Sequence, residues 1–259
     1  MLRQLVPLLK KGHILRQEML EAFSDYSYCF GELLYTDYTD GIVSGCRLTT
    51  TRDTIIINQG ILCFQGKLFL IKQPVSVGYH PTNAVCILKA CYLGEAWTES
   101  FITHEMDILL GEDATRREGE IELCRFTLQP GACLRCEYVD FEDRSTEYDT
   151  LNTLHSPYAA PGRGTLSPDI TRAFAREMLA CPLENQTDIS FCLDLLRGWE
   201  PVAAEAISAY IRLRTGQGGA EGSNLELYKG LLGILREVRN GSHVPPSPRP
   251  QRRKAILVD

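Results

Sequence analysis

Residues 40–72 of the chain read DGIVSGCRLTTTRDTIIINQGILCFQGKLFLIK. Short apolar runs follow one another in this stretch, each about the length of a strand, and they are broken at Gly45, Gly60 and Gly66. Further strand patterns lie in four later stretches, residues 84–93, 101–110, 120–128 and 132–141. Because no helical pattern separates these stretches, they predict an antiparallel β-sandwich or barrel-like module.

Helical patterns lie on both sides of the strand region. Residues 14–23 carry apolar side chains at helical spacing, and residues 167–241 contain four short amphipathic stretches. Ser167-Pro168 and the capping box from Ser223 to Glu226 predict where the first and last of these four helices begin. The chain is therefore expected to be α+β, with the antiparallel β module followed by a small all-helical bundle.

The 259 residues are enough for two modules, each with its own core. Residues 145–166 are polar and contain several prolines and glycines, so they are interpreted as a linker. The predicted division is an N-terminal helical arm at 1–39, a β domain at 40–144, the linker at 145–166, a four-helix domain at 167–241 and a disordered, Pro-rich basic tail at 242–259.

Composition is that of an ordinary soluble protein, with 44% hydrophobic and 23% charged residues. No apolar run approaches the roughly 18 residues of a membrane-spanning helix. Pro7 interrupts residues 1–12, where a signal peptide would need an unbroken apolar region. We therefore expect synthesis in a cytoplasm, no signal peptide and no membrane partner.

Charge is unevenly distributed along the chain, whose net charge is −6. Residues 95–149 carry 15 acidic and 5 basic side chains, and an acidic surface repels phosphate. The basic residues Arg249, Arg252, Arg253 and Lys254 lie in the Pro-rich tail, where a solvated end is the expected role and contact with nucleic acid or a partner is the alternative. No nucleic-acid partner is expected.

Most of the ten cysteines lie within apolar patterns, where a free thiol behaves as a small buried hydrophobe. Cys133 and Cys136 form a C-x-x-C pair, which leaves a zinc site and a redox dithiol open as alternatives. A zinc site would need a second pair at suitable spacing, and two sulfurs three residues apart in a strand point to opposite faces. We expect structural thiols, with no metal and no cofactor.

Catalytic signatures are missing from the sequence. It contains no G-x-x-x-x-G-K-[ST], no G-x-G-x-x-G after a strand, no H-E-x-x-H and no G-x-S-x-G. A carboxylate pair for glycoside hydrolysis could be drawn from a set of acidic residues comprising Glu105, Asp107, Glu112 and Asp113. A solvated acidic face is the expected role of these residues, and the chain is expected not to be an enzyme.

Four motifs occur in a characteristic order: DGIVSG at 40–45, NQGILCFQGKLFLI at 58–71, EIELCRFTLQPGA at 120–132 and DFEDRS at 140–145. In this order and spacing they resemble the β modules of phage tail, baseplate and tail-fibre attachment proteins, over roughly residues 26–145. The resemblance implies a non-enzymatic component of a phage or prophage tail, or of a phage-tail-like particle. Its implied partners are other tail or baseplate proteins and symmetry copies of the chain itself.

A helical bundle follows the β module where such proteins usually continue into fibrous segments, which favours an adaptor role over a fibre tip. Tyr35, Tyr38 and Asp40, just before and at the start of the first motif, are the predicted partner-interface residues. Tyr26, Tyr28 and other nearby aromatic residues are expected in core or loop packing. The alternative function is a glycan or small-molecule binding protein with an aromatic and acidic pocket in the β domain.

Overall fold

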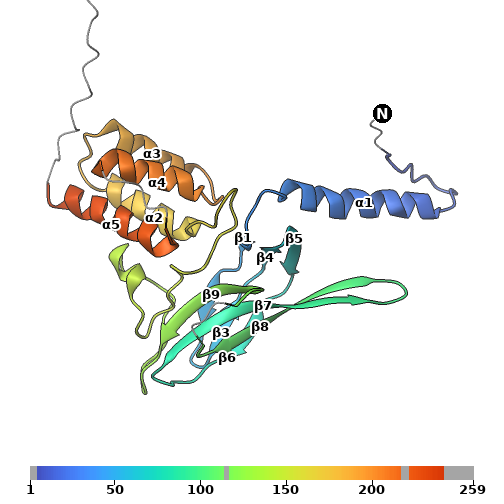
Figure 1. Ribbon diagram of the computed structural model, residues 1–259, viewed down its shortest axis with the longest axis horizontal. Helices are drawn as coiled ribbons and strands as arrows, with labels where there is room; N and C mark the ends of the chain where they lie inside the picture. The colour runs from blue at the N-terminus through green and yellow to red at the C-terminus, as the bar shows by residue number, and fades with distance from the viewer. Residues whose placement is uncertain (1–4, 114–116, 217–221, 242–259) are drawn as a thin grey trace, which may run out of the picture.

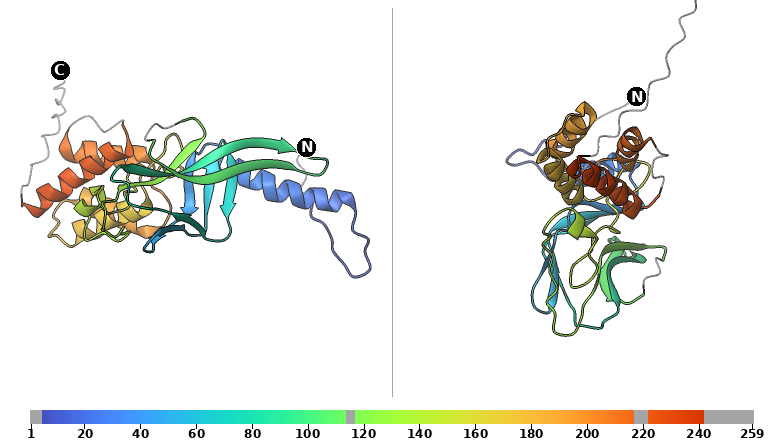
Figure 2. Two further views of the ribbon diagram at one scale, coloured as in Figure 1. Left: turned by 90° about the horizontal axis from the view of Figure 1, so that it is seen from below. Right: turned by 90° about the vertical axis from the view of Figure 1, so that its left-hand side faces the viewer.

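A computed structural model describes residues 5–113, 117–216 and 222–241. It has an N-terminal helix, a region of antiparallel sheets and a bundle of four helices, in that chain order (Figure 1). The β region lies between the two helical parts, and the N-terminal helix points away from the bundle (Figure 2). The predicted α+β class, with an antiparallel β module followed by a helical bundle, is confirmed.

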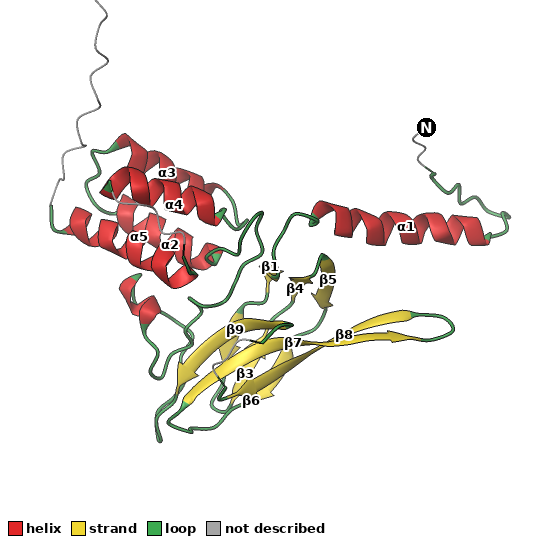
Figure 3. Ribbon diagram, in the orientation of Figure 1, coloured by secondary structure: helices red, strands yellow, loops and turns green. Residues whose placement is uncertain are grey.

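Three antiparallel sheets make up the β region (Figure 3). The first has the order β1-β4-β5 and the second β2-β3-β6, and the third has the order β8-β7-β9. The strands are β1 (Gly41–Gly45), β2 (Leu48–Thr50), β3 (Thr54–Ile57), β4 (Gly60–Phe64), β5 (Lys67–Ile71), β6 (Val75–Gly78), β7 (Val85–Trp97), β8 (Ile102–Gly111) and β9 (Glu120–Thr127). Ile57, Leu62, Leu88 and Phe126 come from all three sheets and share one buried core.

Close backbone approach explains two glycines of the opening stretch. Gly45 and Gly60 are paired across β1 and β4. Gly45 has a φ of +67°, and a Cβ atom built on Gly60 would lie 2.3 Å from the backbone nitrogen of Cys46. No side chain fits at such a distance, so the pairing of the first and second motifs depends on glycine here.

The bundle consists of α2 (Pro168–Leu179), α3 (Gln186–Arg197), α4 (Ala204–Thr215) and α5 (Asn224–Arg239). Helices α2 and α5 begin at the predicted capping residues. The Ser167 side chain accepts a hydrogen bond from the backbone N–H of Asp169, and Ser223 forms the capping box with Glu226. The core between the helices is fully buried and aromatic at its centre, where Phe174 contacts Tyr210.

Residues 141–166 join the two parts through contacts with both. Leu151 belongs to the core of the β region, whereas Phe141, Leu154 and Leu166 belong to the core of the bundle. The backbones of Asn152 and Arg125 of β9 exchange two hydrogen bonds, at 2.7 and 2.9 Å. The stretch predicted as a linker is therefore packed against its neighbours, and the exact domain boundaries stay a prediction.

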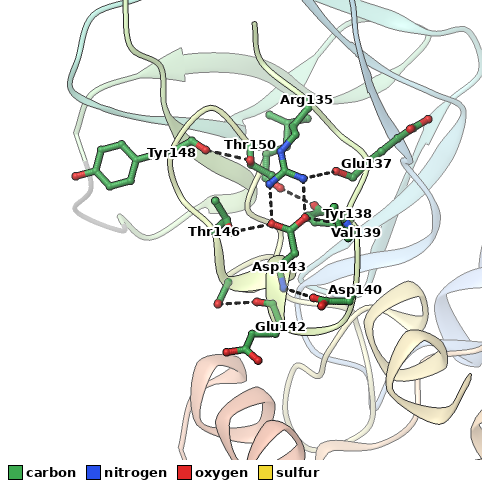
Figure 4. Close-up of polar contacts among 12 residues, drawn as sticks. Arg135, Glu137, Tyr138, Val139, Asp140, Glu142, Asp143, Thr146, Tyr148 and Thr150 are labelled. Atoms are coloured by element: carbon green, nitrogen blue, oxygen red, sulfur yellow. Dashed lines mark hydrogen bonds and ion pairs between the residues drawn. The ribbon is translucent and has the colours of Figure 1, made fainter. Parts of the chain in front are cut away.

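The strand predicted at residues 132–141 is wrong, because this segment makes only a single bridge, between Arg135 and Thr150. Instead of a strand, the chain makes a turn around the carboxylate of Asp143 (Figure 4). The Asp143 carboxylate accepts two 2.6 Å hydrogen bonds from the Arg135 guanidinium and one of 2.9 Å from the backbone N–H of Val139. This pulls the chain into the short helix η1 (Glu142–Ser145), and the Arg135 guanidinium holds the pKa of Asp143 well below its usual range.

Helix α1 (Gln17–Leu34) differs from the short helix predicted at residues 14–23. It continues without a break through the stretch expected in core or loop packing, and none of its side chains is buried. The stacked rings of Tyr26 and Phe30, with centroids 5.6 Å apart, are one helical turn apart and support this continuation. In the described part of the chain, no helix is long and apolar enough to cross a membrane.

Candidate protein interface

An apolar seam runs along α1 and stays largely exposed, with Leu5 of the N-terminal segment lining an open hollow beside Tyr26, Phe30 and Leu33. It consists of Met19, Phe23, Tyr26, Phe30 and Leu33, at alternating spacings of four and three residues. This is the heptad spacing by which one helix packs against another, and it keeps all five side chains on one face. Because none of the five is buried, α1 presents a helix-packing surface without a second helix.

The sides of the seam carry no charge. Leu20, Ser27 and Leu34 lie along one side, and Ala22 and Cys29 lie along the other. In paired helices these are the positions whose charges decide which partner is accepted, so two copies of this seam would meet without like-charge repulsion.

Acidic residues instead lie farther round α1, as a set that comprises Glu18, Glu21, Asp25 and Glu32, and of these Asp25 lines the hollow beside the seam. Only the last turns of the helix rest on the body of the protein. A Cβ atom on Gly31 would lie 3.2 Å from Leu68 of β5, and this face is about a quarter of a turn from the seam. The body therefore holds the helix at one end and leaves the seam open.

A second projection is formed by the distal part of the β7–β8 hairpin. Strand β9 pairs with β7 only from Val85 to Cys91, whereas β8 pairs with it as far as Trp97. Beyond β9 the hairpin is a two-stranded ribbon that extends on the same side of the molecule as α1 (Figures 1 and 2). Trp97 and Phe101 at its tip are 71% and 74% exposed. Large exposed aromatic side chains on a projecting element are typical of contact surfaces.

The base of this hairpin is fixed to the sheet of β1, β4 and β5. The Tyr92 ring lies 4.8 Å from that of Phe64 and 6.2 Å from that of Phe69, measured between centroids. Its hydroxyl is 3.2 Å from Nδ1 of His104, which lies 3.6 Å from the Glu95 carboxylate. These contacts give His104 a structural role and hold the ribbon in one direction.

The three predicted interface residues lie where α1 meets the body. The rings of Tyr35 and Tyr38 make an edge contact at 5.0 Å, Tyr38 bridges to Pro161, and the Asp40 carboxylate accepts a 2.6 Å hydrogen bond from the backbone N–H of Gln65. Burial, together with Tyr38 and Glu200, raises the pKa of Tyr35. All three residues are half-buried in contacts within the chain, and their role in a partner interface stays a prediction.

The other predicted candidates lie away from α1 and from the tip of the ribbon. Glu105 and Asp107 are exposed on β8, where they line an open hollow of about 450 Å³ with Phe69 of β5. Cys133 is exposed and Cys136 is half-buried, and all ten cysteines are free. Among the described residues, no group of three or more His, Cys, Asp or Glu side chains is placed to hold a metal ion.

Sequence reasoning overlooked the seam and the ribbon. The signal for the seam was present, because the 4-3-4-3 spacing from residue 19 to residue 33 is visible in the sequence. The signal for the ribbon was weaker. Trp97 and Phe101 flank a three-residue turn, but Gly94 interrupts the strand pattern before them.

No family model matches the chain, and no curated protein matches it. Among solved structures, the crystal structure of TssK aligns with it at a TM-score of 0.40 and 10% sequence identity. The alignment covers 93% of this chain and 70% of the TssK chain. A likeness this distant carries no argument about function.

Proposed function

We propose that this chain is a non-enzymatic assembly protein of a phage or prophage tail or baseplate, or of a phage-tail-like particle, in which it acts as an adaptor. The observation that carries the proposal is the exposed heptad seam of α1, none of whose side chains is buried. Most helical stability in proteins comes from packing of an apolar face, and no side chain of α1 is buried. A helix with this seam is expected to be completed by a partner.

The two projections give the adaptor its mode of contact. The α1 seam packs against a helix of a second copy or of another tail or baseplate protein, and the aromatic tip of the β7–β8 ribbon docks beside it. Since both extend on the same side of the molecule, one neighbouring subunit in a symmetric assembly can be contacted by both. The four-motif resemblance of the β module supports the tail setting, with synthesis in a bacterial cytoplasm before assembly.

A second candidate is favoured by the hollow between β5 and β8. There the exposed carboxylates of Glu105 and Asp107 lie near Phe69, which is the combination expected of a glycan or small-molecule site. This hollow is open, whereas the seam sets five apolar side chains at heptad spacing on one exposed helix face, so assembly is the function that we propose.

Site-specific photo-crosslinking in the full-length chain tests the proposal. A photo-reactive residue replaces Tyr26 on the seam, and in a matched variant it replaces Tyr28 on the opposite face of the same helix. We expect crosslinks from position 26 to a second copy or to a tail or baseplate protein, and few from position 28. Equal crosslinking from both positions, or none from position 26 in cells that produce the particle, would overturn the proposal.

A further inference from the structure

Strand β8 is an edge strand whose outer side is unpaired. In the sheet of order β8-β7-β9 it is hydrogen-bonded to β7, and no other strand of the described residues pairs with it. Strand β6 approaches β8, but the two strands belong to different sheets and are not hydrogen-bonded to each other. Strand β8 has 10 residues, whereas most strands have about 5–6. Its outer side is therefore a long row of backbone groups open to another strand.

The hydrogen bonds of the sheet show which groups of β8 face outward. Tyr92 of β7 lies opposite Met106, and its backbone N–H is turned away from β8, toward a carbonyl just before β9 at 2.9 Å. Residues directly opposite in an antiparallel pair share one hydrogen-bonding state, so the N–H and C=O of Met106 point to the outer edge. Since this state alternates along a strand, the same holds for His104 and Ile108. The Ile108 N–H agrees, because it donates to the Asp107 carboxylate at 2.8 Å instead of to β7.

The open hollow of about 450 Å³ between β5 and β8 lies along this edge. Residues 104–108 of β8 line it, so the outward backbone groups and the hollow adjoin each other. Met106 and Ile108 are half-buried there, and so are Phe69 and Ile71 of β5 in the same lining. A strand laid along β8 would find hydrogen-bond partners in the backbone and apolar contacts in the hollow.

The residues that alternate with Met106 along this edge are acidic. Glu105 and Asp107 are exposed, and neither forms an ion pair with a described residue. Lys72 is the one lysine or arginine among the described residues that line the hollow, so two carboxylates stand against one amine. An incoming strand with basic side chains at alternate positions would place them beside both carboxylates.

The same carboxylates disfavour a second copy of the chain as the occupant. If two β8 edges paired antiparallel about Met106, Glu105 of one copy would lie opposite Asp107 of the other. Like charges directly opposite each other in a sheet are destabilising, and charged residues on an edge strand commonly protect it from pairing with identical chains. The edge therefore rejects its own copy and suits a strand of opposite charge.

We propose that residues 104–108 of β8 bind an extended segment of a partner protein by antiparallel strand addition, and that this segment alternates basic with apolar side chains. The apolar side chains enter the hollow beside Met106 and Ile108, and the basic side chains pair with Glu105 and Asp107. A row of backbone donors and acceptors at strand spacing fits a peptide better than the glycan considered above for this hollow. The edge does not involve the α1 seam, so this proposal can fail or hold independently of the assembly proposal.

Fluorescence anisotropy of a labelled peptide with the full-length chain tests the edge. The probe is fluorescein-Lys-Val-Arg-Val-Lys-Val-Arg-amide, and the control peptide has glutamate in place of each basic residue. We expect the basic peptide to bind at least tenfold more tightly, and Glu105→Lys/Asp107→Lys to reverse this preference. Asp194→Lys/Glu205→Lys makes the same change of charge at exposed positions of α3 and α4 and should keep it. An unchanged preference in the β8 variant would overturn the proposal.

Methylated peptides test the strand pairing with the unchanged chain. In the proposed pairing the valines share a face with Met106 and Ile108, so they lie opposite these residues and turn their N–H groups toward β8. N-methylation of the valines keeps every side chain but removes these donors, and we expect at least a tenfold loss of affinity. Methylation of the two internal basic residues, whose N–H groups face away, is the control and should be tolerated. Equal affinity of the two methylated peptides would overturn antiparallel addition.

Two further measurements test the other occupants. Binding of an oligosaccharide that requires Glu105 and Asp107, without binding of the basic peptide, would assign the hollow to a glycan and overturn the proposal. Deletion of residues 242–259, which include Arg252 and Arg253, should leave peptide affinity unchanged. A tenfold gain in affinity on this deletion would show that the chain's own tail occupies the edge, and would overturn the assignment to a partner.

Discussion

Placing two glutamates on the α1 seam, in the variant Phe23→Glu/Phe30→Glu, should separate copies of the chain that associate through it. Phe23 is 45% and Phe30 55% exposed, so about half of each side chain remains to be buried by a partner. Complete burial of a phenylalanine is worth about 1.5–3 kcal/mol, and the remaining half is therefore worth about 1 kcal/mol. Two copies bring four such side chains together.

The expected loss is roughly 4 kcal/mol from apolar burial alone, which corresponds to about a thousandfold rise in the dissociation constant. Burial of unpaired glutamates would add to this loss. A matched control is Ser24→Glu/Tyr28→Glu, which adds the same two charges on the exposed opposite face. The control should associate like the unchanged chain.

Size-exclusion chromatography with light scattering, over a series of protein concentrations, measures the effect. We expect the unchanged chain and the control to reach a defined multiple of 29.1 kDa and the seam variant to stay at 29.1 kDa. Circular dichroism checks that both variants keep their helix content. The reasoning is refuted if both variants lose association alike, or if the seam variant associates as well as the unchanged chain.

Three further predictions concern the body and the ribbon. Gly60→Ala should destabilise the chain by more than about 2 kcal/mol in a denaturant titration, because the new Cβ would overlap the backbone; a change near zero would contradict the close approach. The Arg135 guanidinium lowers the pKa of Asp143, so the stabilisation from this pair is complete above the unfolded pKa of about 4 and is lost as the pH falls below it; Asp143→Asn should reduce this acid-dependent loss of unfolding free energy, and an unchanged pH profile would count against the pair. Trp97→Ser/Phe101→Ser should leave the melting temperature within a few degrees while weakening crosslinking to a partner, because both side chains are exposed; an unfolded variant would show that the tip is structural.

The parts of the fold that could be predicted are those with a local periodic signal. Alternating burial along β3 and the apolar runs of β4 and β7 match their sequence patterns, and so do the caps at Ser167 and Ser223. Each signal arises within a few consecutive residues, because strand alternation and helix capping are local. The fold class follows from the order of these signals.

The remainder depends on contacts between distant residues. Leu151, Leu154 and Leu166 are buried, but they are too widely spaced among polar residues to produce a period, so their stretch is interpreted from sequence as a linker. The strand expected at residues 132–141 was replaced by a turn because Asp143 captures Arg135, and no sequence pattern reports that pair.

The candidate interface on α1 could be predicted only in part, because its apolar spacing does not show whether the residues are buried. Apolar residues at helical spacing are usually assigned to a core, and a sequence does not show whether the chain supplies the facing surface. On α1 the described chain leaves the seam without a buried side chain. Tyr35 and Tyr38 are predicted from their position before the first motif; in the structure their rings contact each other, and their role in a partner interface stays a prediction.

The central claim is that this chain is part of a tail or tail-like particle, and co-sedimentation tests it most directly. Tagged full-length chain and a variant without residues 1–34 are produced in cells that make such particles, which are then pelleted and examined by electron microscopy. The account predicts that the full-length chain pellets with the particles and that the variant, still folded, stays in the supernatant. Full-length chain that remains in the supernatant while intact particles pellet without it would contradict the account.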